Sequence, residues 1–494
     1  MGCCKHKNVI ILTTLVFLFL TIGILSMSLW STVYNKILVR ELTITNDSTG
    51  YKMWQETPVP MYLNVFLFNW SNAEEVIDNN WSIKPRFEEL GPYVFSEHHI
   101  RTNLTWINDN QSVIYYQKRI WKFIPELSNG NLSDKVTNVN VVAVAASYLV
   151  RKQGYPVKKI LSFLLGLKEK SLILTKTVDE WLFTGYKDSL LELIASLNLP
   201  IFSSVTSDRF GWFFGRNNSE TYDGNFTMFT GSNDIELLGI INEWNGKPYS
   251  PYFNDYCAFV NGTSGELWPP VEKYDLVDIF APDLCSSVRL QFQDSYKEFF
   301  GIRGKKYAAT DFDFDNGTKY PEQKCFITDQ TYPSGVRDIS KCKFGAPAFV
   351  SYPHFYLADP FYANSVDGMH PNKTAHEFYI ILEPNTGVPL EARAALQLNL
   401  LIQPISGISM FKKVKKTFMP MVYFTQTALL SKPLAKEAKM LLTLPSVMLY
   451  TGGALVGIAL LGALAGIYIT CNRAWTTREE ENRLLDGQQN NVQQ

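Results

Sequence analysis

The sequence predicts a mixed β and α extracellular or lumenal domain anchored by two transmembrane helices, one near each end of the 494-residue chain. Three observations predict this fold class. Two long apolar segments contain no charged residue, and the stretch between them alternates strand-like patterns with one helix-like region. The same stretch also contains many acceptor sequences for N-glycosylation, which is typical of a domain on the non-cytosolic side of a membrane.

The first apolar segment, Val9–Trp30, lies in a stretch without charges between Lys7 and Lys36. A bilayer core of ~30 Å requires roughly 20 helical residues, so the segment is long enough to span it. The alternative is a cleavable signal peptide, with a basic start and small residues at Ser26-Met27-Ser28. Because the apolar run exceeds the ~7–15 residues usual in such peptides, we interpret residues 8–30 as a retained transmembrane helix.

The second apolar segment is centred on Tyr450–Ile469, in a stretch without charges between Lys439 and Arg473. Its glycine and alanine content is tolerated in lipid, because a helix satisfies its own backbone polar groups. The alternative is a buried core helix. The position just before a short charged tail favours a second transmembrane helix at residues 441–471.

The sequons predict the orientation of the chain. Eleven N-x-S/T acceptors lie between the two spans, in residues 31–440, and this region is therefore predicted to be glycosylated and lumenal or extracellular. Residues 1–7 and 472–494 are then cytosolic. The predicted glycosylation sites are Asn46, Asn69, Asn80, Asn103, Asn110, Asn131, Asn217, Asn225, Asn261, Asn316 and Asn372.

The seven cysteines divide according to this topology. Four of them lie in the glycosylated region, which predicts two disulfides with three possible pairings: Cys257, Cys285, Cys325 and Cys342. The other three lie at the cytosolic edges of the spans and are candidate S-palmitoylation sites: Cys3, Cys4 and Cys471.

Most of the glycosylated region has the pattern of strands. Ile114–Phe123 is rich in aromatic and branched residues, and Leu396–Ile402 alternates apolar and polar residues at several steps. Residues 141–199 differ, because their apolar residues recur at helical spacing, with breaks near Gly154-Tyr155-Pro156, Leu167–Lys170 and Gly185. These helices either cap the sheet or present a ligand surface, and the residues alone favour neither alternative.

No catalytic, metal or cofactor motif stands out. The sequence lacks the nucleophile elbow, the H-E-x-x-H zinc motif, C-x-x-C and the Walker A loop, and its six histidines are not at zinc-ligand spacings. We therefore expect no enzyme activity and no cofactor. The net charge of -1 argues against nucleic acid as a partner.

The predicted cytosolic tail contains an acidic dileucine motif, in which three residues separate Glu480 from Leu484-Leu485. Two exposed leucines can fill an apolar pocket on a sorting adaptor while the acidic group meets a basic patch. The motif therefore predicts a role in sorting, although a short motif of this kind also occurs by chance.

Several phrases of the sequence, taken in order along nearly the whole chain, resemble the class B scavenger receptors. The matching segments are Glu89–Phe95, Thr177–Leu190, Gly335–Cys342, Pro353–Phe355, Glu383–Gly387 and Leu396–Asn399. The start, Met1-Gly2-Cys3-Cys4, is most similar to the croquemort branch of insects. The family also includes fatty acid translocase and a lysosomal integral membrane protein.

This resemblance implies an antiparallel β-barrel core with an apical helical bundle at residues 141–199 and an apolar tunnel. It implies binding of fatty acids, phospholipids, lipoproteins, and apoptotic or microbial surfaces. A ligand-contacting lysine pair would fall on Lys168 and Lys170, although Glu169 weakens the local positive charge. The implied disulfides are Cys257–Cys325 and Cys285–Cys342.

The resemblance also bears on location. We expect a scavenger receptor of the plasma membrane that passes through endosomes, with an endolysosomal protein for protein trafficking or lipid export as the alternative. The dileucine motif favours the alternative. The absence of histidine between His99 and His354 opposes it, because release of a protein cargo at acid pH suits a histidine in the helical bundle.

Overall fold

A computed structural model describes the backbone of residues 2–169, 171–197, 202 and 207–492. The side chains of residues 2–9, 31, 294 and 485–492 are outside this description. The chain divides into two compact units. One comprises residues 1–40 and 433–494, and the other comprises Glu41–Lys432.

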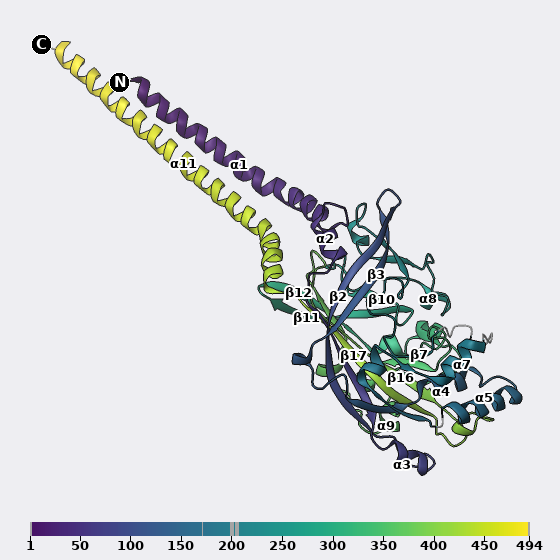
Figure 1. Ribbon diagram of the computed structural model, residues 1–494. Coiled ribbons are helices and arrows are strands. Elements are labelled where there is room, and N and C mark those ends of the chain that lie inside the picture. The colour runs from purple at the N-terminus through teal and green to yellow at the C-terminus, as the bar shows by residue number, and fades with distance from the viewer. Residues whose placement is uncertain (1, 170, 198–201, 203–206, 493–494) are drawn as a thin grey trace. The chain divides into compact units, whose positions relative to one another are not determined.

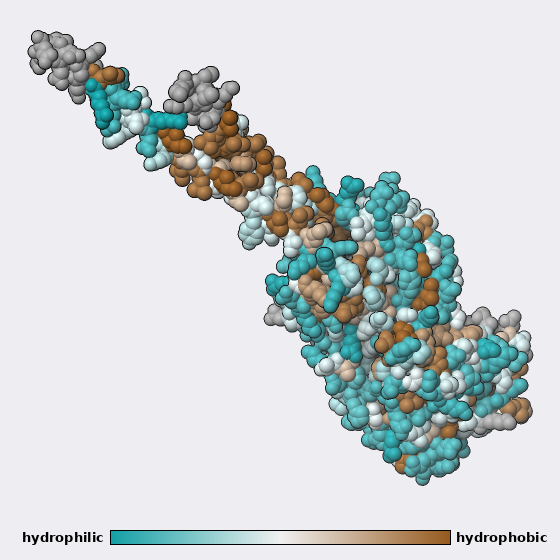
Figure 2. All heavy atoms as spheres, turned by 60° about the vertical axis from the view of Figure 1, so that its left-hand side comes forward, coloured by the Kyte–Doolittle hydropathy of each residue, from teal (hydrophilic) through white to brown (hydrophobic). Residues whose placement is uncertain are grey.

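The first unit consists of two long helices, α1 (Gly2–Leu42) and α11 (Lys432–Val492). Each contains a segment long and apolar enough to cross a membrane, and Figure 2 shows hydrophobic side chains gathered on both helices. The helices pack closely, because a Cβ atom on Gly23 would lie 2.9 Å from the carbonyl oxygen of Gly452. Small residues at such contacts let helices approach each other in lipid.

The second unit is built on an antiparallel sheet that curls into a nearly closed barrel (Figure 1). Eleven strands follow the order β10-β11-β12-β15-β16-β17-β1-β2-β3-β8-β9, and β14 pairs with both β13 and β16. The segment after β9 partly closes the gap to β10, since the Ile241 N–H donates to the carbonyl of Gly262, and Thr263 forms a bridge with Ile279.

The strands follow the alternating pattern expected of a sheet with one buried face. In β1, buried and half-buried residues alternate over most of its length, as the period of two requires. The strands are β1 (Met61–Trp70), β2 (Phe87–Ile107), β3 (Ser112–Phe123), β4 (Lys135–Val139), β5 (Ile173–Thr177), β6 (Tyr186–Lys187), β7 (Arg209–Phe210), β8 (Asn225–Phe229), β9 (Ile241–Trp244), β10 (Leu276–Ala281), β11 (Ser286–Phe299), β12 (Ile302–Ala309), β13 (Arg337–Asp338), β14 (Ala348–Ser351), β15 (Tyr379–Leu382), β16 (Pro389–Ile402) and β17 (Thr417–Leu429).

The helices of this unit are concentrated in one insertion between β4 and β7. They are α4 (Val141–Leu149), α5 (Tyr155–Lys168), α6 (Val178–Leu182) and α7 (Ser189–Leu197). Local signals fix their starts: the Asn140 side chain caps α4 by accepting from the Ala143 N–H, and Thr177 and Glu180 form a capping box on α6. The remaining helices are short: α2 (Thr49–Gln55), α3 (Ala73–Asp78), α8 (Asp255–Ala258), α9 (Pro360–Ser365) and α10 (Lys373–His376).

The structure contains the predicted number of two disulfides. Cys257 is bonded to Cys325 and Cys285 to Cys342, which are the pairs that the family resemblance implies. Both connect the segment around β10 and β11 to the long connection between β12 and β14. Cross-links over such separations reduce the entropy of the unfolded chain.

Candidate functional site

The principal candidate site is a partly open, apolar cavity of about 380 Å³, and the helices α4 and α7 and the barrel strands β14, β16 and β17 contribute to its walls. Figure 1 shows α4 and α7 beside β16. We call it the helix-capped cavity. Its volume lies near the lower end of the ~300–1,000 Å³ typical of small-molecule sites.

The sequence explains why this space is apolar and unfilled. Helix α4 has the composition VVAVAASYL, and its Ala145 and Ala146 line the cavity where larger side chains would fill it. On β16, Leu396, Leu398 and Leu400 are two residues apart and therefore face the cavity together. The cavity thus offers aliphatic contact on both sides.

A buried ion-pair cluster lies at the cavity wall. Both terminal nitrogens of Arg216 donate to the carboxylate of Asp283 at 2.9 Å, and one of them also donates to Asp223 at 2.9 Å. Burial alone would lower the pKa of the Arg216 guanidinium, but the two aspartates outweigh it and raise the pKa. Burial alone would raise the pKa of Asp283, but the charge of Arg216 outweighs this effect and holds the pKa of Asp283 well below its usual range. Arg216 therefore remains charged, and both of its terminal nitrogens are paired with carboxylates.

Lys343 is a second cation at the same wall, and its situation is different. It lines the cavity, is half-buried, and forms no ion pair with any carboxylate of the described part of the chain. Burial lowers the pKa of its ammonium group, and Arg216 lowers it further, against the attraction of Asp283. An ammonium in an apolar cavity without a close counter-ion favours an anionic group in the ligand.

Helix α5 carries two apolar stripes. Leu161 and Leu165 are buried against the rest of the insertion. Ile160, Phe163 and Leu167 form the second stripe and are 62%, 66% and 55% exposed. One apolar stripe suffices to dock a surface helix, so the second marks a surface for contact with an apolar partner.

One lysine of the predicted pair, Lys168, lies at the end of this helix. Lys168 is exposed in the last turn of α5 and is not among the residues lining the cavity, whereas Lys170 is outside the described residues. Glu169 is turned inward: the Asn140 amide donates to its carboxylate at 2.5 Å. Burial, assisted by Asp188, raises the pKa of Glu169 to about 6. Its negative charge is therefore drawn away from the surface of α5.

The other predicted modification and sorting sites are distributed over the surface. Eight sequon asparagines are exposed, and Asn69, Asn225 and Asn316 are half-buried. Cys471 is exposed, as are Glu480 and Leu484. The side chains of Cys3, Cys4 and Leu485 are outside the described residues.

Two buried histidines pair with acidic side chains. His99 lies between Glu97 and Glu266, with both distances 2.7 Å, and His354 pairs with Glu89 at 2.6 Å. Within the described residues, no group of three or more histidine, cysteine or acidic side chains could hold a metal ion.

Sequence reasoning missed the cavity residues Arg216, Asp283 and Lys343. They lie in three connections far apart in the chain, and only the fold brings them together. One feature of the sequence pointed to the proximity of Lys343 and Asp283. Lys343 directly follows Cys342, Asp283 lies two residues before Cys285, and a disulfide joins the two cysteines.

Comparisons of the sequence with known proteins identify a family and several relatives. The sequence model of the CD36 family matches residues 11–470. Protein peste of Drosophila melanogaster is 32% identical over 444 residues, which are 90% of this chain and 78% of that protein. Scavenger receptor class B member 1 of Mus musculus is 32% identical over 457 residues, covering 92% and 87% of the two chains. Lysosome membrane protein 2 of Homo sapiens is 27% identical over 434 residues, covering 86% and 87%.

Proposed function

Since this chain belongs to the CD36 family, we propose that it is a plasma-membrane scavenger receptor that captures lipidic ligands and accepts their hydrocarbon tails in the helix-capped cavity. The observation that carries the proposal is the cavity itself, with aliphatic and aromatic walls and with Lys343, which has no ion pair within the described part of the chain. Each CH₂ group transferred from water into such a site contributes ~0.8 kcal/mol. A cavity of this kind needs no chemical step to act, so the proposal is a receptor and not an enzyme.

In this proposal one surface contacts the lipid carrier and another binds the single lipid. The exposed stripe of α5, with Lys168 beside it, contacts the lipid particle or membrane that carries the ligand. Lys343 then pairs with the anionic head of a single lipid whose tail enters the cavity. Residues 31–440 would face the exterior with both termini in the cytosol, so that ligand surface and glycans share one side.

The experiment fills the cavity without changing the surface. Ala145→Phe places a ring in the space beside α4, and Ala375→Phe makes the same change at an exposed alanine in α10. With the purified, delipidated full-length chain in detergent, we expect oleate to bind at least about tenfold more weakly to Ala145→Phe, and Ala375→Phe to match the unchanged protein. Capture of lipid particles by cells should persist in both variants, because α5 is intact.

Equal oleate binding by Ala145→Phe and the unchanged protein would overturn the proposal. A loss in both variants would point to general disturbance of the fold, which a thermal unfolding curve would detect. This comparison separates occupancy of the cavity from adhesion to the surface of α5.

An endolysosomal role is the second candidate, and the exposed Glu480 and Leu484 together with the similarity to a lysosome membrane protein support it. In this case Leu484→Ala with Leu485→Ala should shift the steady-state distribution from endosomes to the cell surface. Unchanged distribution in imaged cells would remove that support.

A further inference from the structure

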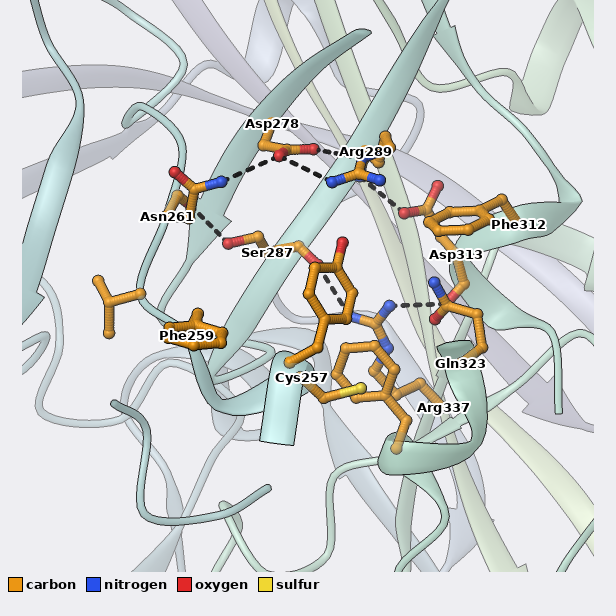
Figure 3. Close-up of a pocket in the computed structure, with 13 residues that line it drawn as sticks. Cys257, Phe259, Asn261, Asp278, Ser287, Arg289, Phe312, Asp313, Gln323 and Arg337 are labelled. Carbon is orange, nitrogen blue, oxygen red and sulfur yellow. Dashed lines mark hydrogen bonds and ion pairs between the residues drawn. The ribbon is translucent and has the colours of Figure 1, made fainter. Parts of the chain in front are cut away.

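A second pocket, of about 270 Å³, lies beside the Cys257–Cys325 disulfide and takes no part in the proposed function. We call it the disulfide-side pocket (Figure 3). Aromatic rings make up much of its wall: Tyr256, Phe259, Phe312 and Phe326. The volume is just below the range of drug-sized sites and suits one small ring-shaped occupant.

A chain of polar side chains runs along one edge of this pocket. The Asn261 amide donates from Nδ2 to Asp278 Oδ2 at 3.1 Å, and Arg289 donates from Nε to the other oxygen of Asp278 at 2.9 Å. Figure 3 shows these three residues joined in this order. The Arg289 guanidinium also lies over the rings of Tyr256 and Phe312, at 5.8 and 5.4 Å from their centroids.

Asn261 is also the acceptor of a sequon, Asn261-Gly262-Thr263, and Nδ2 is the atom to which a glycan is attached. The backbone around it is held in place. Gly262 has a φ of +94°, and a Cβ atom there would lie 2.3 Å from the carbonyl oxygen of Asp278. The Ser287 hydroxyl donates to the carbonyl of Asn261 at 2.5 Å. A sugar on Nδ2 must therefore begin at the edge of the pocket, and the linked amide keeps one N–H for Asp278.

Phe259 provides an apolar surface at the same edge. It lies two residues before Asn261, and both residues are exposed whereas Val260 between them is buried. Its ring is 47% exposed and packs against Tyr249, with the centroids 5.0 Å apart. The C–H face of a pyranose ring is apolar and flat, and it gains contact by packing on such a ring.

Two residues that line the pocket have a buried polar atom without a hydrogen bond among the described residues. Gln323 Oε1 and Arg337 Nε have no hydrogen-bond partner among the described residues, and both residues line the pocket. A buried acceptor and a buried donor without partners each carry a desolvation cost. An N-acetyl group offers one N–H and one carbonyl, which are the two kinds of partner that Gln323 Oε1 and Arg337 Nε lack.

We propose that the disulfide-side pocket is the binding site for the first N-acetylglucosamine of the glycan on Asn261, which packs on Phe259 beside Asp278 and Arg289. The sugar then covers Phe259 and the disulfide-bonded segment and closes the pocket to other ligands. The proposal requires only that this domain is glycosylated, and it is independent of the lipid-binding proposal. The opposing acidic and basic groups of the pocket fit a neutral sugar better than an ion.

The test is a double-mutant cycle on the full-length chain produced in glycosylating cells. Asn261→Gln should lower the midpoint of thermal unfolding by about 1–3 °C. Phe259→Ala should lower it similarly, and the double variant should show little further loss, because both changes remove one contact. Asn131→Gln removes a glycan at an exposed site outside the pocket and should leave the midpoint unchanged.

An endoglycosidase that leaves one N-acetylglucosamine on each asparagine separates the first sugar from the rest of the glycan. The trimmed protein should have the same midpoint of thermal unfolding as the protein with complete glycans. If Asn261→Gln does not fold, the rate of cleavage by the endoglycosidase is measured instead. On the folded protein, Phe259→Ala should speed cleavage of the glycan on Asn261 several-fold relative to that on Asn131. An unoccupied Asn261 in glycopeptide mass spectrometry, additive losses in the cycle, or equal release rates would overturn the proposal.

Discussion

The helix-capped cavity and the disulfide-side pocket lie in the same unit and balance their charges differently. Arg216 and Lys343 lie near Asp283 in the first, and Arg289 and Arg337 lie near Asp278 and Asp313 in the second. In the disulfide-side pocket, Arg289 is paired with Asp278, and Arg337 lies close to Asp313. In the helix-capped cavity, Arg216 pairs with both Asp223 and Asp283, and Lys343 has no ion pair among the described residues. The way in which partners are distributed, rather than the number of charges, therefore decides which site leaves a cation without an ion pair.

The acids of the two sites show the same contrast. Arg216 contacts the carboxylate of Asp283 through two hydrogen bonds, and the pKa of Asp283 is lowered. Arg337 instead donates to the backbone carbonyl of Asp313, and burial raises the pKa of the Asp313 carboxyl to about 6 although Arg337 opposes this shift. Direct contact with the carboxylate thus outweighs burial in one site and is missing in the other.

The largest expected effect is the loss of the cation that holds the cavity wall. Arg216→Met removes the main partner of the buried Asp223 and of the partly exposed Asp283, and leaves them only the more distant Arg119. Removal of one side of a buried ion pair costs about 3–5 kcal/mol. We expect that loss in the free energy of unfolding, measured by urea denaturation of the full-length chain.

Arg209→Met is the matched control. Arg209 lines the same cavity but donates to the backbone carbonyls of Thr184 and Gly185, so its loss should cost about 1 kcal/mol. Equal losses for the two arginines would show that the distribution of partners described above does not matter.

The second effect is a pH dependence in the disulfide-side pocket. Because the pKa of Asp313 is about 6 in the folded protein and 3.8 by reference, the folded state binds more protons between these values. The free energy of unfolding should therefore fall as pH rises from 4 to 6, by up to about 3 kcal/mol in total. Asp313→Asn keeps one acceptor oxygen for the Arg289 backbone N–H and places an N–H group opposite the Tyr352 hydroxyl oxygen, which can accept it, and the variant should flatten this part of the curve.

Urea denaturation at a series of pH values measures this slope. Asp109→Asn, at an exposed turn residue, should leave it as in the unchanged protein. An unaltered slope in Asp313→Asn would mean that Asp313 is already ionised at low pH, and the contrast between the two acids would disappear.

Much of the fold could be predicted from the sequence, for reasons that particular segments make clear. The absence of charge from Lys7 to Lys36 revealed α1, and the alternation in Leu396–Ile402 revealed part of β16. These signals are local. Closure of the barrel depends on pairing between distant strands such as β1 and β17, which no local pattern encodes, and it was predicted only through the family resemblance.

The sites were less predictable. The resemblance named Lys168, which lies exposed at the end of α5, but it did not reveal Lys343. A lysine next to a cysteine in a connection is ordinary in sequence, and its meaning comes from the apolar walls that α4 and β16 place around it. Similarly, the sequon predicted a glycan on Asn261 but not the ring of Phe259 beside it.

The smallest effect concerns the lysine that the comparison singles out. Lys343→Met removes the charge but keeps the apolar stem, so we expect binding of oleate to weaken about tenfold, which is 1.4 kcal/mol, through loss of one charge-assisted contact. Binding of methyl oleate, which has no charge, should be unchanged. Because burial lowers the pKa of Lys343, its charge is a cost to the folded state, and the variant should be at least as stable as the unchanged protein.

Lys341→Met makes the same change two residues earlier at an exposed position outside the cavity, and should bind both lipids normally. Titration of the full-length chain with the two lipids distinguishes the outcomes. A loss of equal size for oleate and its methyl ester would assign Lys343 to packing rather than to the head group. A loss of stability without a change in selectivity would mean that Lys343, like Arg216, stabilises the wall of the cavity. The two cations would then differ only in how much stability they contribute.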